Sequence, residues 1–115
     1  MTEQSLREPT LLLLTALADA PRHGYALIKE VETISRGRVR LRAGTLYGAL
    51  ERLLKQGLIR VESEEVVDSR MRRTYALTDA GSVLLAAEAE RLRATADEAV
   101  RRLGINLDRP DGATA

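Results

Sequence analysis

Apolar residues recur at helical spacing in the first 35 residues and predict two helices there. Pro9 suits the first position of a helix, and Ala20-Pro21 interrupts the apolar repeat that follows it. A second helix is expected to open at His23-Gly24 and to close at Ser35-Arg36-Gly37. The apolar positions are Leu11, Leu14, Leu17 and Ala18 in the first helix, and Leu27, Ile28, Val31 and Ile34 in the second.

The spacing changes to two between Arg38 and Arg42, which predicts a short strand or an extended connector. A third helix is expected to begin near Gly44-Thr45 and to be capped by Gly57. Its buried stripe would hold Leu46, Leu50, Leu53 and Leu54, and its outer face Thr45, Tyr47, Gly48, Glu51, Arg52 and Lys55.

Two further runs predict a β-hairpin after this helix. Ile59 and Val61 are expected to pair with Tyr75 and Leu77 on its inner face. The tip would be a long loop over residues 66–70 rather than a tight two-residue turn.

A final helix of about 25 residues is expected between a Thr78 cap and a Gly104 stop. Its apolar and small residues follow a heptad pattern, typical of helices that pair with another helix. A helix this long outruns a small core, which favours dimerisation, although packing within one protomer is the alternative. The expected interface comprises Leu85, Ala89, Leu92, Ala96, Ala99 and Leu103, supported by Leu11 and Leu14 of the first helix.

These elements predict a mainly α fold with a small β-hairpin, in a chain of one domain's length. We expect a flexible N-terminus over residues 1–8 and a winged helix-turn-helix domain over residues 9–78. A dimerisation helix would follow over residues 79–104, and a disordered tail over residues 105–115.

Composition excludes several classes of function. The chain has no cysteine and one histidine, so it lacks the ligands of a structural zinc site and a Cys/His nucleophile; no metal or cofactor is expected. Its acidic residues fall on separate faces, which argues against an enzyme. No apolar run is long enough for a membrane span, and the cytoplasm is the expected compartment.

Charge is distributed unevenly although the net charge is only +1. Residues 1–35 and 74–115 each balance at −2, whereas residues 36–73 hold ten basic and five acidic side chains, a balance of +5. A basic helix-plus-hairpin unit is typical of proteins that bind double-stranded DNA. The candidate DNA-binding residues are Arg36, Arg38, Arg40, Arg42, Thr45, Tyr47, Gly48, Arg52, Arg70, Arg72 and Arg73.

Tyr47 and His23, near this unit, can each have a structural role in place of a functional one. Tyr47 either packs its ring against the hairpin or donates a hydrogen bond to a phosphate, and both can hold together. His23 has no second ligand or nucleophile to serve, so a structural role at the start of its helix is favoured.

Several motifs together resemble the PadR-type transcriptional regulators. They are His23-Gly24-Tyr25, Gly44-Thr45-Leu46-Tyr47, Leu50 with Leu53, Gly57-Leu58-Ile59, Arg73-Thr74-Tyr75-Ala76-Leu77-Thr78 and Ala80-Gly81. The resemblance covers about residues 9–103 and is to the subfamily with a short C-terminal helix. It implies a homodimeric winged-helix repressor. Gly48 and the Val66-Val67-Asp68 turn depart from the family's usual pattern.

A twofold dimer would present two recognition helices to an inverted-repeat operator. Regulators of this family often respond to small molecules, but a chain without Trp or Phe offers no large aromatic platform for a planar ligand. A small phenolic effector and no effector both stay open. The rival function is a winged helix used as a protein-interaction adaptor.

Overall fold

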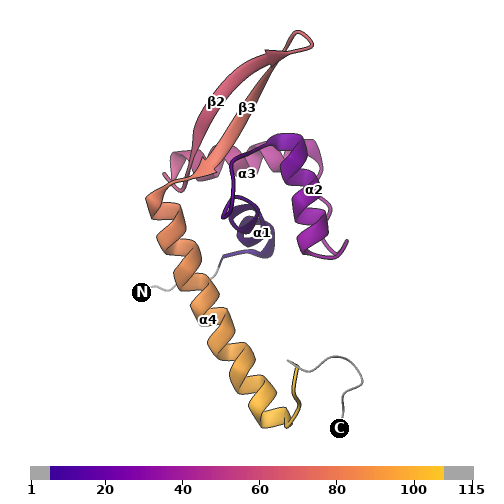
Figure 1. Ribbon diagram of the computed structural model, residues 1–115, viewed down its shortest axis with the longest axis vertical. Coiled ribbons are helices and arrows are strands. Elements are labelled where there is room, and N and C mark those ends of the chain that lie inside the picture. The colour runs from indigo at the N-terminus through magenta and orange to yellow at the C-terminus, as the bar shows by residue number, and fades with distance from the viewer. Residues whose placement is uncertain (1–5, 108–115) are drawn as a thin grey trace. The chain divides into compact units, whose positions relative to one another are not determined.

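The computed structural model describes residues 6–107 and contains four helices and three strands within them (Figure 1). The helices are α1 (Glu8–Ala16), α2 (Gly24–Ile34), α3 (Ala43–Lys55) and α4 (Asp79–Leu103). The strands are β1 (Arg22–His23), β2 (Ile59–Val67) and β3 (Arg70–Leu77). The chain divides after Leu85 into two compact units, and α4 contributes its first turns to one unit and the rest of its length to the other.

The first unit has a core built mainly from leucines of α1, α2 and α3. Its fully buried large side chains are Leu13, Leu14, Leu27, Val31, Leu46, Leu50, Leu53 and Ile59. Tyr75 of β3 is 4 % exposed and joins this cluster. Burying each such side chain contributes about 1.5–3 kcal/mol, so the three helices and the base of the sheet hold one another in place.

The strands form an antiparallel sheet in the order β1-β3-β2. Ile59 pairs with Leu77 and Val61 with Tyr75, which confirms the expected inner face of the hairpin. The sheet also contains β1, a strand that the sequence does not predict. In it, Arg22 pairs with Tyr75 and His23 with Thr74. Two residues are too few to show an alternating pattern in sequence. The fold class is confirmed, with a three-stranded sheet in place of a simple hairpin.

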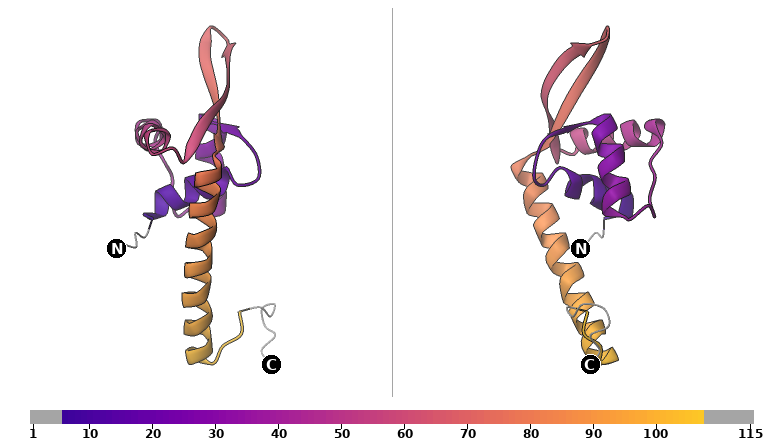
Figure 2. Two further views of the ribbon diagram at one scale, coloured as in Figure 1. Left: turned by 90° about the vertical axis from the view of Figure 1, so that its left-hand side faces the viewer. Right: turned by 45° about the vertical axis from the view of Figure 1, so that its right-hand side comes forward.

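The tip of the hairpin differs from the prediction. Val67 pairs with Arg70, which leaves Asp68 and Ser69 as a two-residue turn rather than a long loop. Both turn residues have positive φ, 53° and 66°, as a type I′ turn requires. Such a turn matches the right-handed twist of the strands, so β2 and β3 stay paired to their ends (Figure 2).

Two other local predictions are corrected, and one alternative that the sequence left open is decided. Helix α1 ends at Ala16, four residues before Ala20-Pro21, with Leu17 as its cap. Ile34, expected to be buried, is 37 % exposed at the end of α2. Residues 38–42 form the extended connector and not the short strand; Val39 and Leu41 pack partly on the core, and the arginines between them are exposed.

Both ends of α4 agree with the sequence. The Thr78 hydroxyl accepts a hydrogen bond from the Gly81 amide at 3.0 Å, and Gly104 ends the helix with a φ of 69°. Gly81 allows a close backbone approach, since a Cβ there would lie 2.1 Å from the Leu58 carbonyl oxygen. The cap and this approach join the start of α4 to the base of the hairpin.

The heptad positions of α4 are mostly exposed. Leu92 is 40 % and Leu103 69 % exposed, and Ala89, Ala96 and Ala99 are exposed as well. Leu14, expected beside them at the interface, is instead fully buried in the core of its own protomer, so its side chain has no surface to offer a partner. Leu11 is half-buried.

The expected flexible N-terminus and disordered tail lie partly outside the described residues, which exclude 1–5 and 108–115. Of the expected N-terminal segment, Leu6 packs against the core and Glu8 begins α1.

Candidate nucleic-acid interface

Helix α3 presents the outer face that its sequence predicted. Thr45, Tyr47, Gly48 and Arg52 are exposed, while Leu46 and Leu50 of the opposite face are buried. The helix ends in a Schellman motif: the Gly57 amide donates to the Leu54 carbonyl and the Leu58 amide to the Leu53 carbonyl, both at 3.0 Å. The cap fixes where β2 leaves the helix and therefore where the hairpin stands beside α3.

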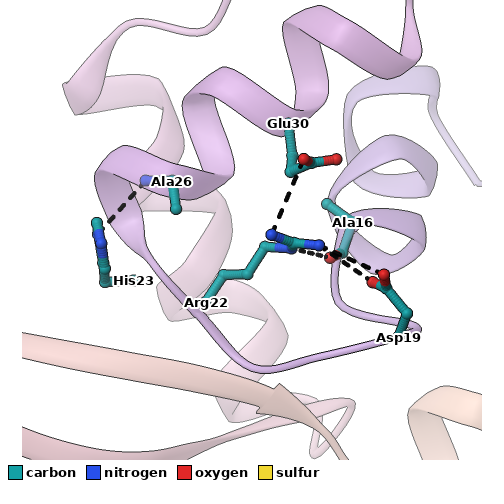
Figure 3. A network of polar contacts seen from close by, with 6 residues as sticks. All are labelled: Ala16, Asp19, Arg22, His23, Ala26 and Glu30. Carbon is teal, nitrogen blue, oxygen red and sulfur yellow. Dashed lines mark hydrogen bonds and ion pairs between the residues drawn. The ribbon is translucent and has the colours of Figure 1, made fainter.

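The start of α2 is held by Arg22, the first residue of β1 (Figure 3). Its Nε donates to the Ala16 carbonyl at the end of α1 at 2.8 Å. Its guanidinium also contacts Asp19 at 3.2 Å and Glu30 of α2 at 3.8 Å. One partly buried side chain thus ties α1, α2 and the edge of the sheet together.

His23 caps α2, which agrees with the structural role favoured from the sequence. Its Nδ1 accepts a hydrogen bond from the Ala26 amide at 3.4 Å (Figure 3). The next residue, Gly24, faces the ring of Tyr47: a Cβ on Gly24 would lie 2.4 Å from the Tyr47 hydroxyl oxygen. The Tyr47 ring therefore packs on the start of α2. Tyr47 nevertheless remains 48 % exposed as a residue.

A groove of about 650 Å³ lies between the start of α2, α3 and the β2–β3 hairpin. Figure 1 shows the hairpin extending well past α3. We call residues 63–73 of this hairpin the wing. The groove is lined by His23, Gly24 and Tyr25, by Tyr47, Leu50 and Glu51, and by Val67, Arg70, Met71, Arg72, Arg73 and Tyr75. It brings together four of the predicted residues, Tyr47, Arg70, Arg72 and Arg73.

Tyr75 and Arg73 both line this groove. A hydrogen bond to the Tyr75 side chain, together with the charge of Glu64, raises the pKa of the Arg73 guanidinium above its ordinary value. Burial raises the pKa of the Tyr75 phenol. Arg73 thus lines the groove as a cation that is paired with Glu64 at 2.9 Å.

The predicted arginines fall into two groups by their ion pairs. Four are paired with carboxylates: Arg38 with Glu8, Arg40 with Glu32 at 3.4 Å, Arg72 with Glu65 at 3.2 Å and Arg73 with Glu64 at 2.9 Å. The other four have no carboxylate within salt-bridge distance among residues 6–107: Arg36, Arg42, Arg52 and Arg70. The second group therefore consists of cationic side chains that no carboxylate of residues 6–107 neutralises.

Eight groove-lining residues are not among the predicted site residues: His23, Gly24, Tyr25, Leu50, Glu51, Val67, Met71 and Tyr75. The first three carry a family motif, which could have signalled them, but only the fold brings α2 next to the wing. Arg36, Arg38, Arg40 and Arg42 are exposed around the connector and do not line the groove. Arg36 and Gly37 both have positive φ, 57° and 82°, at the end of α2.

Within the described part of the chain, no group of His, Asp or Glu side chains could hold a metal ion. None of the described helices is long and apolar enough to cross a membrane. The arrangement has the chemistry of a basic surface with one exposed helix and a wing.

An exposed third helix followed by a hairpin wing defines a winged helix-turn-helix protein. Residues 13–87 match the model of the transcriptional regulator PadR-like family, so the chain belongs to the PadR-like transcriptional regulators. The resemblance noted from the motifs is thereby confirmed, and the family places the chain among transcriptional regulators rather than enzymes.

Two relatives are similar in sequence. The transcriptional regulator Rv3488 of Mycobacterium tuberculosis is 40 % identical over 88 residues, which cover 76 % of this chain and 78 % of the relative. An uncharacterized 37.1 kDa protein of a Streptomyces fradiae transposon is 44 % identical over 79 residues, 69 % of this chain. The match spans only 21 % of that longer protein.

Solved structures share the fold. A PadR-family regulator of Eggerthella lenta is 29 % identical, with a TM-score of 0.65 over 84 % of this chain and 82 % of that one. A PadR-family regulator of Clostridium difficile has a TM-score of 0.68 at 22 % identity, covering 84 % and 98 %. Bacillus subtilis PadR, crystallised with operator DNA, has a TM-score of 0.62 at 20 % identity, covering 70 % and 47 %.

Proposed function

We propose that this regulator is a cytoplasmic homodimeric repressor that binds an inverted-repeat operator. The observation that carries the proposal is the groove in which the wing arginines stand beside the exposed face of α3. In a winged helix, the recognition helix enters the major groove while the wing approaches the neighbouring backbone or minor groove. The operator-bound state of Bacillus subtilis PadR supports the same use of this fold.

We assign the contacts by side-chain chemistry. Thr45, Gly48 and Arg52 would face base edges from α3, with Arg52 suited to guanine. Phosphates would be contacted by Tyr47 and by the arginines of the connector and the wing: Arg36, Arg38, Arg40, Arg42, Arg70, Arg72 and Arg73. Because Arg42 is also the residue before α3, its contact would fix the register of the recognition helix on the duplex.

Dimerisation would use the exposed apolar and small residues of α4. Leu85, Ala89, Leu92, Ala96, Ala99 and Leu103 follow one another at spacings of three and four, as in a coiled-coil seam. The exposure of Leu92 and Leu103 in the protomer supports a second helix as their partner. Leu11, half-buried on α1, would contribute at the edge.

A titration of the chain's own upstream DNA in a gel-shift assay tests the proposal. We expect saturable binding whose affinity falls steeply with salt, because arginine contacts to phosphate release counterions. A protein-interaction adaptor with the same fold would bind DNA weakly and with little sensitivity to salt, and that result would contradict the proposal.

Release by a small-molecule effector belongs to the same proposal. The absence of Trp and Phe argues against a large planar ligand, so small phenolic compounds are the effectors to test. Adding them to the preformed complex should lower the shifted fraction at fixed DNA concentration. A shift that does not change with a panel of such compounds would contradict effector control of this kind.

A further inference from the structure

Two acidic residues of β2 stand directly opposite two of the wing arginines on β3. The register pairs Glu64 with Arg73 and Glu65 with Arg72. The Arg73 Nε lies 2.9 Å from a Glu64 carboxylate oxygen, and the Arg72 Nη2 lies 3.2 Å from one of Glu65. Neighbouring residues of a strand point to opposite faces, so one pair lies on each face of the ribbon.

Each of these pairs is held by one hydrogen bond. On α4, by contrast, Arg101 donates through both Nε and Nη2 to the two oxygens of Glu98. The wing pairs use one nitrogen each, Nη2 of Arg72 and Nε of Arg73. Arg72 even keeps a buried Nε without an acceptor among the described residues. A single exposed hydrogen bond contributes little, so a phosphate oxygen can replace the carboxylate.

Two of the three wing arginines are therefore paired with carboxylates before the wing meets DNA. Arg70, next to the turn, has no carboxylate partner among residues 6–107, whereas Arg72 and Arg73 each have one. A phosphate that approaches either paired arginine also approaches a carboxylate within about 3 Å of that guanidinium. The repulsion opposes the electrostatic term that supplies essentially all of non-specific binding.

We propose that Glu64 and Glu65 are specificity-determining residues of the DNA interface. On an arbitrary duplex, only phosphate contacts hold the protein, and their net gain is small while the carboxylates remain. On the operator, base contacts from α3 fix the wing against the backbone, and Arg72 and Arg73 exchange their carboxylates for phosphates. The two acids thus weaken binding to arbitrary DNA more than binding to the operator. The inference rests on the proposed function.

The test compares isosteric variants that remove one negative charge each. Glu64→Gln, Glu65→Gln and the double variant are titrated by fluorescence anisotropy against two duplexes of equal length. One is the stretch of upstream DNA that the unmodified protein protects in a footprint, and the other has the same bases in shuffled order. Glu62→Gln is the matched control. It lies on the same strand and loses the same charge, but its partner is Arg60 at 2.5 Å, and neither residue lines the groove.

We expect each wing variant to bind the shuffled duplex about two- to fivefold more tightly, the range that corresponds to an exposed ion pair. The magnitude of its salt slope should rise by up to about 0.9 for each arginine released. The operator affinity should rise less, so the ratio of the two affinities should fall. Glu62→Gln should leave this ratio unchanged. Melting curves would show that each variant is folded.

Two results would overturn the inference. Weaker binding of the wing variants to both duplexes would mean that the carboxylates position the arginines for phosphate. An equal gain for Glu62→Gln would mean that only net charge matters. Failure of the proposed function looks different, because the unmodified protein itself would then show no salt-dependent binding to either duplex.

Discussion

The first unit and the second half of α4 differ in where their apolar side chains lie. In residues 6–85, the large apolar side chains of α1 to α3 are mostly buried within the protomer, and Leu13, Leu14 and Leu46 show no exposed surface. In residues 86–107, Leu92, Leu103 and Ile105 are 40 %, 69 % and 47 % exposed. The helices α1 to α3 thus bury most of their leucines within the protomer, whereas the second half of α4 leaves leucines of its heptad stripe exposed.

This difference separates folding from assembly. Substitutions at buried positions of the first unit should change the stability of the protomer, and those on its exposed α3 face should change DNA binding directly. Substitutions on the α4 stripe should change association and only then DNA binding.

Leu92→Asp should have the largest effect. Near a twofold axis it would bring two unpaired carboxylates into the seam, at a cost of several kcal/mol. We expect monomers at micromolar concentration by light scattering, with the helical circular dichroism of the first unit retained. A variant that stays dimeric would show that the stripe is not the interface.

Gly81→Ala should destabilise the first unit by about 1–3 kcal/mol, because the added Cβ meets the Leu58 carbonyl oxygen and backbone cannot move aside as a side chain can. Gly48→Ala is the matched control. Nothing lies within 4 Å of a Cβ there, and alanine should stabilise α3 by about 0.5–1 kcal/mol. Denaturant unfolding measures both, and equal effects would contradict the close approach.

Arg42→Ala should lower the magnitude of the salt slope by about one unit and weaken binding to all duplexes alike. Arg40→Ala should do less, because Arg40 is already paired with Glu32 at 3.4 Å. The measurement is anisotropy across a range of salt concentrations. Unchanged slopes combined with an altered sequence preference would contradict the assignment of these arginines to phosphate.

Thr45→Ala should have the smallest effect on overall affinity. A single hydroxyl can contact more than one base, so its loss should alter the preference between related operators by about 1 kcal/mol. Competition between operator variants measures this preference. A uniform loss across all of them would move Thr45 from the base-contacting set to the backbone-contacting set.

The sequence predicted best where local chemistry decides the structure. The Gly57 cap, the Thr78 cap, the Gly104 stop and the exposed face of α3 depend on residues within a few positions of one another. The turn at Asp68 and Ser69 was missed because it lacks the glycine that usually marks a type I′ turn.

Contacts between distant segments escaped prediction for a different reason. Periodicity reports which face of an element is apolar, but it does not report which element covers that face. The packing of Tyr47 on Gly24 and the pairing of Arg38 with Glu8 join residues 23 and 30 positions apart. The groove depends on the packing of Tyr47 on Gly24 and on β1. The sequence therefore predicts only some of its lining residues.

In the proposed dimer, two first units joined through α4 bind one operator together. Footprinting of an operator with about five base pairs inserted between its half-sites is the decisive experiment, because half a helical turn moves one half-site to the opposite face of the duplex. Protection of the insert-bearing operator should fall towards the non-specific range, with Kd of about 10⁻⁴ to 10⁻⁶ M, as for Leu92→Asp on the native operator. Full protection after the insertion would contradict the coupled dimer and leave each winged helix binding alone.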